Sequence, residues 1–545
     1  SLEVAPMPKA RSRSAKRSEA PASALVAAAP TPLPPSGTVA TVGASRARLR
    51  ASRDEIRAAV ARARTAQAIW SRRPEGERKD ALLRAAKTML LHRRDAMAIV
   101  REEMGKGEVE GLFNETLGPV DAVKGWASVL DGVLGPRSVR LNPLAFPKKS
   151  ATVELVPRGV IGVIAPWNFP IAGLYRSLFP ALLTGNGVVV KPSEYTPRST
   201  GWLVQELAKE LPEGLVSVVE GDGVVGQQLL ESGIDACVFT GSVKTGKGVR
   251  VRCAELGIPS SVEMGGKDAA IVLADCDLSR TLAGITQWAL NNVGQACGAI
   301  EIAYVDERIA DVFAERITAA WQRLRVEPGG PGEVDVAPLA HEAQLAVVEA
   351  HVKDAVAKGA RVLCGGRRGP HGLTYLPTIL DRCDASMAVV AEETFGPVLA
   401  MVRVSGADEA IRQLQASAYG LTASVWTEDI PRGERLAERL DVGVVTINNH
   451  AFTGAIPALP WTGTRDTGFG VANSVHSLPV FTRPKAIVVD RATAPEPFWL
   501  PFDRTLLELG DILAEAQLGK LGRALKLPLL LRRRVAQVRR FFDGE

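Results

Sequence analysis

Residues 236–255 read ACVFTGSVKTGKGVRVRCAE, and this stretch decides the fold. Its first five residues form the short apolar run of a buried strand, and a helix is expected to follow over 244–256. Between them stands Gly241-Ser242, at the first turn of the helix. Backbone N–H groups at a helix start, together with the Ser242 hydroxyl, suit a pyrophosphate, and a plain serine cap is the alternative.

The same alternation of strand and helix extends on both sides of this stretch. Between 159 and 275, β-branched runs such as GVIGVIA, GVVVKP and DAAIVLA alternate with helical stretches, and a second alternation follows from 280 to 450. This rhythm predicts βαβ units around parallel sheets, in two α/β domains. Helical periodicity dominates from 52 to 138, and residues 138–158 alternate and turn like a hairpin.

Length and composition indicate a globular protein of two or three domains. The chain has 545 residues, 46% hydrophobic and 23% charged. Its six cysteines form no CxxC pair, which argues against a disulfide scaffold or a zinc site and favours a reducing, cytoplasmic setting. Residues 1–50 and 516–545 each carry eight Lys/Arg against two acids, which leaves residues 51–515 at −6. Because the excess of basic residues is confined to the two ends of the chain, a groove for nucleic acid across the body of the protein is not expected.

The two ends of the chain differ from its body. Residues 1–45 are rich in Ala, Pro and Ser, and we predict them to be disordered. No apolar run approaches the ~20 residues that span a bilayer. Residues 516–542 mix Leu, Val and Phe with eight basic residues and no acid. That mixture is typical of a segment on an anionic membrane surface; a helix docked on a subunit, or a solvated tail, are the alternatives.

Several polar residues follow predicted strands, where ligands bind in parallel-sheet folds. Asn168, in PWN, can donate to an oxyanion or simply belong to a turn. Lys191 and Glu194 either reach ribose hydroxyls or are solvated charges. Glu263, between two apolar residues, is either paired and structural or a general base. Cys297 alone is more typical of a packing residue, although Gly294 and Gly298 would leave its loop accessible.

Taken together, these stretches resemble the NAD(P)-dependent aldehyde dehydrogenase superfamily. The motifs PWNFP, KPSEYTP, FTGSVKTG, EMGGK, GQAC, EETFGPVL and RDTGFG occur in the family's order over about residues 50–490. The resemblance implies an α/β fold with a Rossmann-like cofactor domain, a catalytic domain with a second parallel sheet, and a β-hairpin oligomerisation element. These are expected at 46–137 with 159–264, at 265–470, and at 138–158 with 471–490, followed by a basic amphipathic extension over 491–545.

The resemblance also implies roles for single residues. Cys297 would attack the aldehyde, forming a thiohemiacetal and then a thioester, while Asn168 holds the oxyanion and Glu263 activates water. The pyrophosphate would bind at 241–246 and not at the GxGxxG match of Gly221–Gly226. The expected cofactor-binding residues are Trp167, Lys191, Glu194, Gly241, Ser242, Glu393 and Phe395, with no metal site. Because Glu194 would repel a 2′-phosphate, NAD is expected, with NADP as the alternative.

Three positions depart from the family pattern. Ile302 stands where many members have a basic residue, Ser177 where many have a lysine, and Asp466 near a glutamate of some members. These three departures put in doubt the rate of catalysis and the relay of protons to and from the site.

The surroundings of PWN and KPSE resemble the fatty and aromatic branch, so a medium or long aliphatic aldehyde is expected to be oxidised to its acid. The alternatives are a CoA-acylating enzyme and a catalytically silent scaffold. A homodimer or homotetramer is expected.

Overall fold

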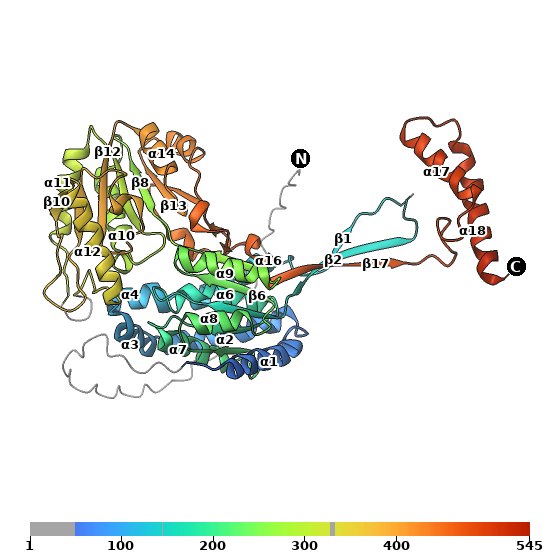
Figure 1. The fold of residues 1–545 in the computed structure, drawn as a ribbon, viewed down its shortest axis with the longest axis horizontal. Coiled ribbons are helices and arrows are strands. Elements are labelled where there is room, and N and C mark those ends of the chain that lie inside the picture. Colours follow the sequence, from blue (N-terminus) through green and yellow to red (C-terminus); the bar gives the residue numbers. More distant parts are fainter. Residues whose placement is uncertain (1–49, 144, 328–332, 545) are drawn as a thin grey trace, which may run out of the picture. The chain divides into compact units, whose positions relative to one another are not determined.

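The computed structural model describes residues 50–143, 145–327 and 333–544, in which helices surround two parallel sheets (Figure 1). The predicted N-terminal tail, 1–45, lies outside the described residues. The first sheet has the strand order β5-β4-β3-β6-β7, all parallel. Its strands are β3 (Val160–Ile164), β4 (Gly187–Lys191), β5 (Val216–Val218), β6 (Ala236–Thr240) and β7 (Ser260–Glu263).

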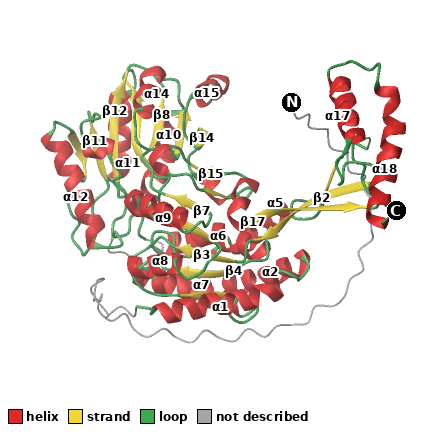
Figure 2. Cartoon of the chain, turned by 45° about the vertical axis from the view of Figure 1, so that its right-hand side comes forward, coloured by secondary structure: helices red, strands yellow, loops and turns green. Residues whose placement is uncertain are grey.

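Helices cover both faces of this sheet because its strands are apolar on both sides (Figure 2). In β3, Ile161 and Val163 pack with the helices of one face, whereas Val160 packs with those of the other. The first face holds α2 (Glu75–Leu91), α3 (Arg93–Met104), α5 (Pro119–Leu130), α6 (Ala172–Leu183) and α7 (Pro197–Ala208). The second holds α1 (Arg53–Trp70), α8 (Gly223–Leu230) and α9 (Val243–Glu255).

The second sheet has the order β10-β11-β12-β9-β8-β13-β14. It is parallel except for β10, which pairs antiparallel with β11 at the edge. The run DAAIVLA, which continued the first alternation in the sequence, supplies β8 of this sheet. The strands are β8 (Asp268–Val272), β9 (Ile300–Asp306), β10 (Arg361–Cys364), β11 (Thr378–Asp381), β12 (Val398–Val404), β13 (Thr422–Trp426) and β14 (Val444–Ile447).

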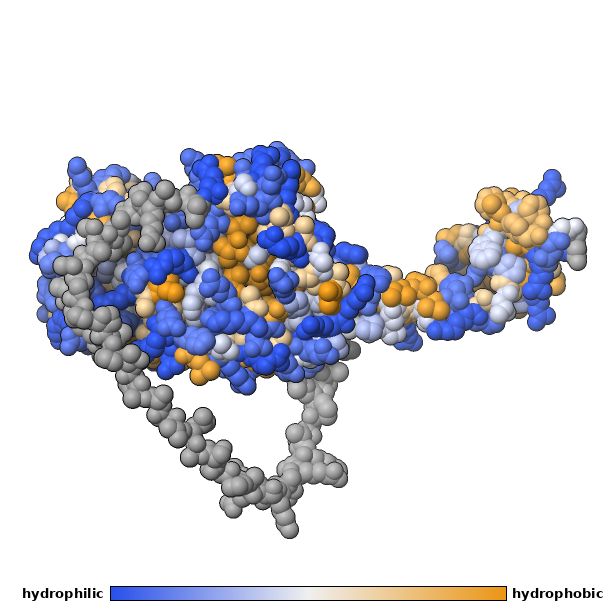
Figure 3. Space-filling view, turned by 90° about the horizontal axis from the view of Figure 1, so that it is seen from below, coloured by the Kyte–Doolittle hydropathy of each residue, from blue (hydrophilic) through white to orange (hydrophobic). Residues whose placement is uncertain are grey.

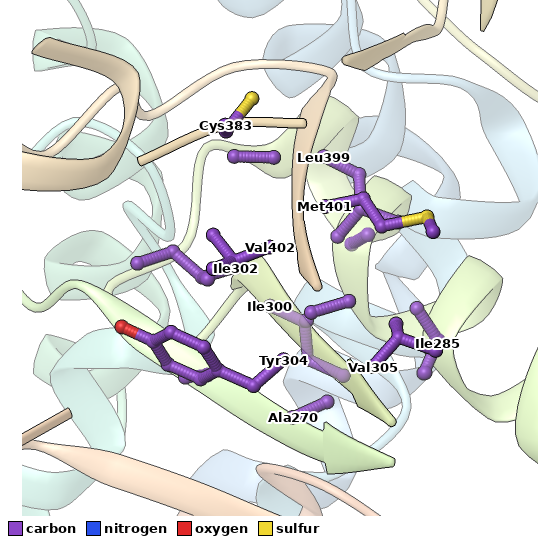
Figure 4. Packing of buried hydrophobic residues seen from close by; sticks show 14 of the residues in the cluster. Ala270, Ile285, Ile300, Ile302, Tyr304, Val305, Cys383, Leu399, Met401 and Val402 are labelled. Atoms are coloured by element: carbon purple, nitrogen blue, oxygen red, sulfur yellow. The ribbon is translucent and has the colours of Figure 1, made fainter. Parts of the chain in front are cut away.

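The core of the second sheet is centred on β9 and β12, whose aliphatic side chains interdigitate (Figure 4). Ile302 is 2% exposed within this cluster, and its register partner on β12 is Ala400. The helices around it are α10 (Leu278–Leu290), α11 (Ala310–Trp321), α12 (Glu342–Ala357), α13 (Ala388–Ala391), α14 (Ala407–Gln415) and α15 (Ile430–Ala437).

The hairpin predicted at 138–158 forms, and the chain returns to it near the end. β1 (Arg137–Val139) pairs antiparallel with β2 (Lys149–Pro157), and β2 pairs along its whole length with β17 (Thr482–Asp490). After β17 come α17 (Arg504–Gln517) and α18 (Leu527–Asp543). Among the described residues, no helix has both the length and the apolar character to cross a membrane.

Candidate active site

Two cavities meet at Cys297. One, of about 320 Å³, is lined by several aromatic residues together with many glycines and alanines, and the other, of about 490 Å³, lies at the carboxyl ends of the first sheet. Both are lined by Phe169, Gly173, Arg176 and Cys297. The thiol is therefore accessible from two separate chambers, which is the arrangement required to bring two reactants to one nucleophile.

A strained turn presents Cys297. After α10, residues Asn291–Gly294 form a 3₁₀ turn in which Asn292 and Val293 have φ of 53° and 59°. This left-handed region is costly for a β-branched residue such as Val293 and persists only where the surroundings fix it. The Asn292 amide fixes it here by donating to the carbonyls of Asn168 (2.9 Å) and Gln295 (3.0 Å).

Two glycines allow close packing around Cys297. A Cβ at Gly298 would lie 2.8 Å from the Trp461 ring, and one at Gly266 would lie 2.6 Å from the Cys297 carbonyl oxygen. The sequence drew attention to Gly298 but not to Gly266, which lies in the EMGGK motif. The second glycine of that motif is therefore explained by its packing against the cysteine loop.

Asn168, for which the sequence analysis predicts an oxyanion-donor role, lies beside the cysteine loop. Its side-chain amide donates to the Gln295 carbonyl at 3.1 Å, and the residue is 7% exposed. This bond uses one of the two amide hydrogens, which leaves the other to donate to a ligand at Cys297.

A buried ion pair, which the sequence did not reveal, holds the Asn168 loop. Lys106 Nζ donates to Glu115 Oε1 (2.5 Å) and to the Asn168 carbonyl (3.0 Å). Glu115 Oε2 accepts from the N–H groups of Ile171 (3.2 Å) and Ala172 (3.0 Å). Glu115 lies in a π-helix, Gly111–Thr116, and the extra residue in that turn shifts the helical phase that a 3.6-residue pattern would assign.

The charged groups around the Cys297 thiol shift its pKa in opposite directions. Burial raises the pKa of Cys297 to about 12, and the nearby Glu263, Asp268 and Glu393 also raise it, while Arg176 lowers it. Burial likewise raises the pKa of the half-buried Glu263, and Arg176 again lowers it. Arg176 is thus the cation shared by the thiol and the carboxylate, although the sequence suggested no role for it.

The larger cavity contains the residues expected to bind the cofactor. Trp167, Lys191, Glu194, Gly241, Ser242, Glu393 and Phe395 all line it. Lys191 Nζ lies 3.4 Å from Glu194 Oε2, and Ser242 caps α9 by accepting from Thr245 N–H. Gly223 and Gly226 of the GxGxxG match line the same cavity, where they begin α8. The donor set fits a dinucleotide, with a capped helix start for phosphates and aromatic rings beside carboxylates.

The position of the Glu393 carboxylate is set by a neighbouring glycine pair and by a second buried ion pair. The carboxylate accepts from Gly266 N–H at 2.9 Å, and a Cβ at Gly265 would lie 2.1 Å from its Oε2. Its pKa is raised to about 8, chiefly by burial. Glu301, paired with the buried Lys267, accepts from the N–H groups of Thr394 and Phe395, at 2.8 Å each. The described residues include no His, Cys, Asp and Glu cluster suited to a metal.

Comparison with known proteins identifies the family. The model described as "Aldehyde dehydrogenase family" matches residues 41–487. The chain belongs to the aldehyde dehydrogenase family.

Two relatives and one solved structure illustrate the likeness. The chain is 35% identical over 450 residues to 4,4'-diapolycopene aldehyde oxidase of Methylomonas sp, which covers 82% of this chain and 84% of that protein. It is 34% identical to a putative succinate-semialdehyde dehydrogenase [NADP(+)] 2 of Mycobacterium ulcerans, over 84% and 90% of the two chains. Comparison with the crystal structure of the Mycobacterium tuberculosis aldehyde dehydrogenase complexed with NAD+ gives a TM-score of 0.76 and 32% sequence identity. The match covers 82% of this chain and 92% of that chain.

The protein is accordingly an NAD(P)-dependent aldehyde dehydrogenase. The fold expected from the sequence, with a Rossmann-like sheet and a second parallel sheet, is confirmed. The domain boundaries and the residue roles stay predictions.

The three departures from the family pattern occupy ordinary structural positions in this aldehyde dehydrogenase. Ile302 belongs to the core of the second sheet, where a basic side chain would be buried. Ser177 donates to the Leu174 carbonyl (3.2 Å) within α6, and Asp466 pairs with Lys247 at 2.7 Å.

Replacing Lys106 tests whether its ion pair positions Asn168. Lys106→Met leaves the Glu115 carboxylate buried without its cation, so the free energy of unfolding is expected to fall by about 3–5 kcal/mol. Lys106→Met/Glu115→Leu removes both charges and is expected to regain most of that stability in chemical denaturation. The kcat of the double variant is expected to stay low, because the 168–172 loop has lost its hydrogen bonds.

The matched control is Arg439→Met, which removes a surface pair with Asp408 (2.7 Å) and is expected to cost less than about 1 kcal/mol. A double variant with the kcat of the wild type would show that the pair does not position Asn168.

The raised pKa of Cys297 predicts the pH dependence of its alkylation. Because the thiolate is the reactive form, the rate of iodoacetamide labelling at Cys297 is expected to rise up to pH 10 without a plateau. Arg176→Met removes the group that lowers the pKa, so labelling is expected to slow at every pH. Peptide mass spectrometry measures the rate, with Cys297→Ala giving the background from other cysteines; a plateau below pH 8 would contradict the prediction.

Proposed function

We propose that this aldehyde dehydrogenase oxidises aldehydes with extended apolar tails to carboxylic acids and uses NAD as the hydride acceptor. The observation that carries the proposal is the position of Cys297, between an aromatic-lined cavity and a nucleotide-sized cleft. In this assignment the first cavity binds the aldehyde and the second binds the dinucleotide.

The first chemical step is addition of the Cys297 sulfur to the aldehyde carbon. The thiol proton leaves through water to Glu263, whose raised pKa suits a base that works near neutral pH. The resulting oxyanion is held by the Asn168 amide and the Cys297 backbone N–H. Each such donor contributes roughly 3–4 kcal/mol to stabilisation of the transition state. Arg176 stabilises the thiolate as it forms.

The second step releases the acid. Bound NAD supplies the acceptor for the hydride that leaves the thiohemiacetal carbon on Cys297. Glu263 first releases the thiol proton to solvent and then takes a proton from a water molecule that attacks the remaining thioester. The C–S bond breaks, the Cys297 thiolate leaves, and the product is the carboxylic acid, which ionises to the carboxylate. Glu263 is also the group that argues against CoA as the acyl acceptor, because that reaction needs no hydrolytic base.

The lining of the first cavity indicates the substrate class. The aromatic residues around it are Phe113, Trp126, Phe169, Tyr175, Trp288, Phe452 and Trp461. Burying each methylene of an aliphatic tail against such walls contributes about 0.8 kcal/mol. The 4,4'-diapolycopene aldehyde oxidase relative is similar to this chain over most of its length, which supports an apolar aldehyde.

A second candidate substrate is a short aldehyde that carries a carboxylate. Arg176 lines the same cavity, with its guanidinium 5.7 Å from the centre of the Trp461 ring. A cation at that place suits a substrate carboxylate, and a relative is named a putative succinate-semialdehyde dehydrogenase.

The subunit state is proposed from the three-stranded sheet. Its order is β1-β2-β17, so β17 is an edge strand, and Ile487, Val488 and Val489 on it are each at least 40% exposed. An apolar edge strand is the usual site for pairing with another chain. We propose a homodimer or homotetramer assembled through this edge, and sedimentation velocity measures it directly.

A series of aldehydes from two to twelve carbons tests the substrate class. With NAD, NADH absorbance at 340 nm is expected to show kcat/KM rising by up to about fourfold per methylene until the cavity is full. Phe113→Ala is expected to lower kcat/KM for long aldehydes and to leave the two-carbon aldehyde unchanged. A fall of kcat/KM with chain length would refute the proposal.

Three further outcomes separate the alternatives. The second candidate would be favoured if kcat/KM is higher for a four-carbon aldehyde with a terminal carboxylate than for its uncharged analogue. Arg176→Leu would then be expected to remove this difference. Turnover only with added CoA would favour an acylating enzyme. Retained NAD binding without turnover of any aldehyde would favour a scaffold.

Cofactor choice is expected to depend on Glu194. Its carboxylate in the cleft would repel the 2′-phosphate of NADP, so Glu194→Gln is expected to shift the NAD/NADP ratio of kcat/KM towards NADP by roughly tenfold or more. Glu213→Gln, an exposed acid outside the cleft lining, is the matched control and is expected to leave the ratio unchanged. An unchanged ratio in Glu194→Gln would contradict this role.

A further inference from the structure

The C-terminal helices form a small hairpin beyond the part of the chain that matches the family. The match ends at residue 487, and α17 and α18 follow the linker after β17. Gln537 donates to Thr505 at 3.3 Å and Arg523 to Glu515 at 3.0 Å, so the two helices run antiparallel. The hairpin has its own apolar core of Leu509, Ile512 and Leu530.

Arg534 secures the base of this hairpin. Its guanidinium is fully buried and donates to the carbonyls of Pro497, Trp499 and Pro501, at 2.7–3.0 Å, and to Asp503 at 3.1 Å. The linker and both helices are therefore one ordered element, residues 496–543, which we call the C-terminal hairpin. Its order argues against the solvated tail considered from the sequence.

Large apolar side chains are exposed at the turn of the C-terminal hairpin (Figure 3). Leu518, Leu521, Leu525 and Leu529 are 65–91% exposed, and we call this group the hairpin tip. At the opposite end Trp499, Phe502, Phe541 and Phe542 are also at least 55% exposed. Soluble surfaces rarely gather so many large apolar groups without a partner.

Cations accompany these apolar groups. Lys520 and Lys526 flank the hairpin tip and are exposed. On α18, the positions 529, 532, 533, 536 and 540 share one outward face by their three- and four-residue spacing. This face begins with Leu529 and carries arginine at positions 532, 533 and 540. Arg532, Arg533, Arg539 and Arg540 are exposed and form no ion pair among the described residues.

We propose that the C-terminal hairpin docks on a membrane surface that contains anionic lipid. The leucines of the hairpin tip enter the boundary between headgroups and acyl chains, and the lysines and arginines contact lipid phosphates. Trp499 and the two terminal phenylalanines suit the same boundary, where aromatic rings collect. A subunit interface fits less well, because the centre of a protein interface is depleted of charge.

Vesicle co-sedimentation of the full chain tests the proposal. The protein is expected to pellet with vesicles of phosphatidylcholine and 30% phosphatidylglycerol, and at least tenfold less with phosphatidylcholine alone. Binding is expected to fall as salt rises from 0.05 to 0.5 M, because the phosphate contacts are screened. No pelleting, or equal pelleting with both vesicles, would overturn it.

Three sets of surface variants assign the binding to the C-terminal hairpin. Leu521→Gln/Leu525→Gln/Leu529→Gln and Arg532→Gln/Arg533→Gln/Arg540→Gln are each expected to weaken vesicle binding at least tenfold. Ile69→Gln/Leu91→Gln removes two residues of comparable exposure elsewhere and is expected to bind as the wild type does. All three are expected to keep the wild-type kcat in vesicle-free buffer, which shows that they fold.

Sedimentation velocity separates the membrane from a second copy of the chain. The tip variant is expected to keep the subunit number of the wild type. A tip variant that loses subunits and binds vesicles as before would show that the hairpin tip is a subunit interface, and would overturn the proposal. Vesicle binding does not depend on any aldehyde, so failure of the proposed substrate class would leave this test intact.

Discussion

The active site depends on the hydrogen bonds that join the loop after β3 to the loop that carries Cys297. The Asn168 amide donates to the Gln295 carbonyl, and the Asn292 amide donates back to the Asn168 carbonyl. These bonds connect the loop that follows β3 of the first sheet to the loop that precedes β9 of the second sheet. They also hold Asn292 and Val293 in the left-handed backbone region, which is costly for the β-branched Val293. The geometry of thiol and oxyanion donor is therefore set by one network.

Two buried ion pairs hold the loops on either side of that hydrogen-bond network. The Lys106–Glu115 pair fixes the Asn168 loop, and the Lys267–Glu301 pair fixes the loop of Glu393 and Phe395. Such pairs contribute little net stability, since desolvation offsets their attraction, but losing one partner is costly. In this protein they act as positioning elements, because each carboxylate also accepts backbone N–H groups of a loop that lines the cofactor cleft or the site.

The sequence predicted the strand–helix alternation and the residues that line the cleft, because both depend on local patterns. GVIGVIA, GVVVKP and ACVFT became strands of one parallel sheet, and every expected cofactor residue lines one cavity. It did not predict Arg176, Lys106 or Glu115. Arg176 stands in a helix that gives no local signal, Glu115 lies in a π-helical turn, and Lys106 lies in the loop after α3, 62 residues before the Asn168 carbonyl to which it donates. The sequence analysis treated Ile302 as a departure that put the rate in doubt, whereas Ile302 is a core residue and its neighbour Glu301 accepts the N–H groups of the Thr394–Phe395 loop.

The sequence by itself determined the family, the order of the motifs and the amphipathic character of residues 516–542, because these properties are carried by residue type and spacing along the chain. Only the tertiary structure decided which charges face the thiol, which glycines allow backbone to approach Cys297, and which C-terminal side chains stay exposed. Those properties depend on distances between segments more than a hundred residues apart, such as Asn168 and Gln295. Burial and electrostatic interaction act through such distances, and local spacing does not encode them.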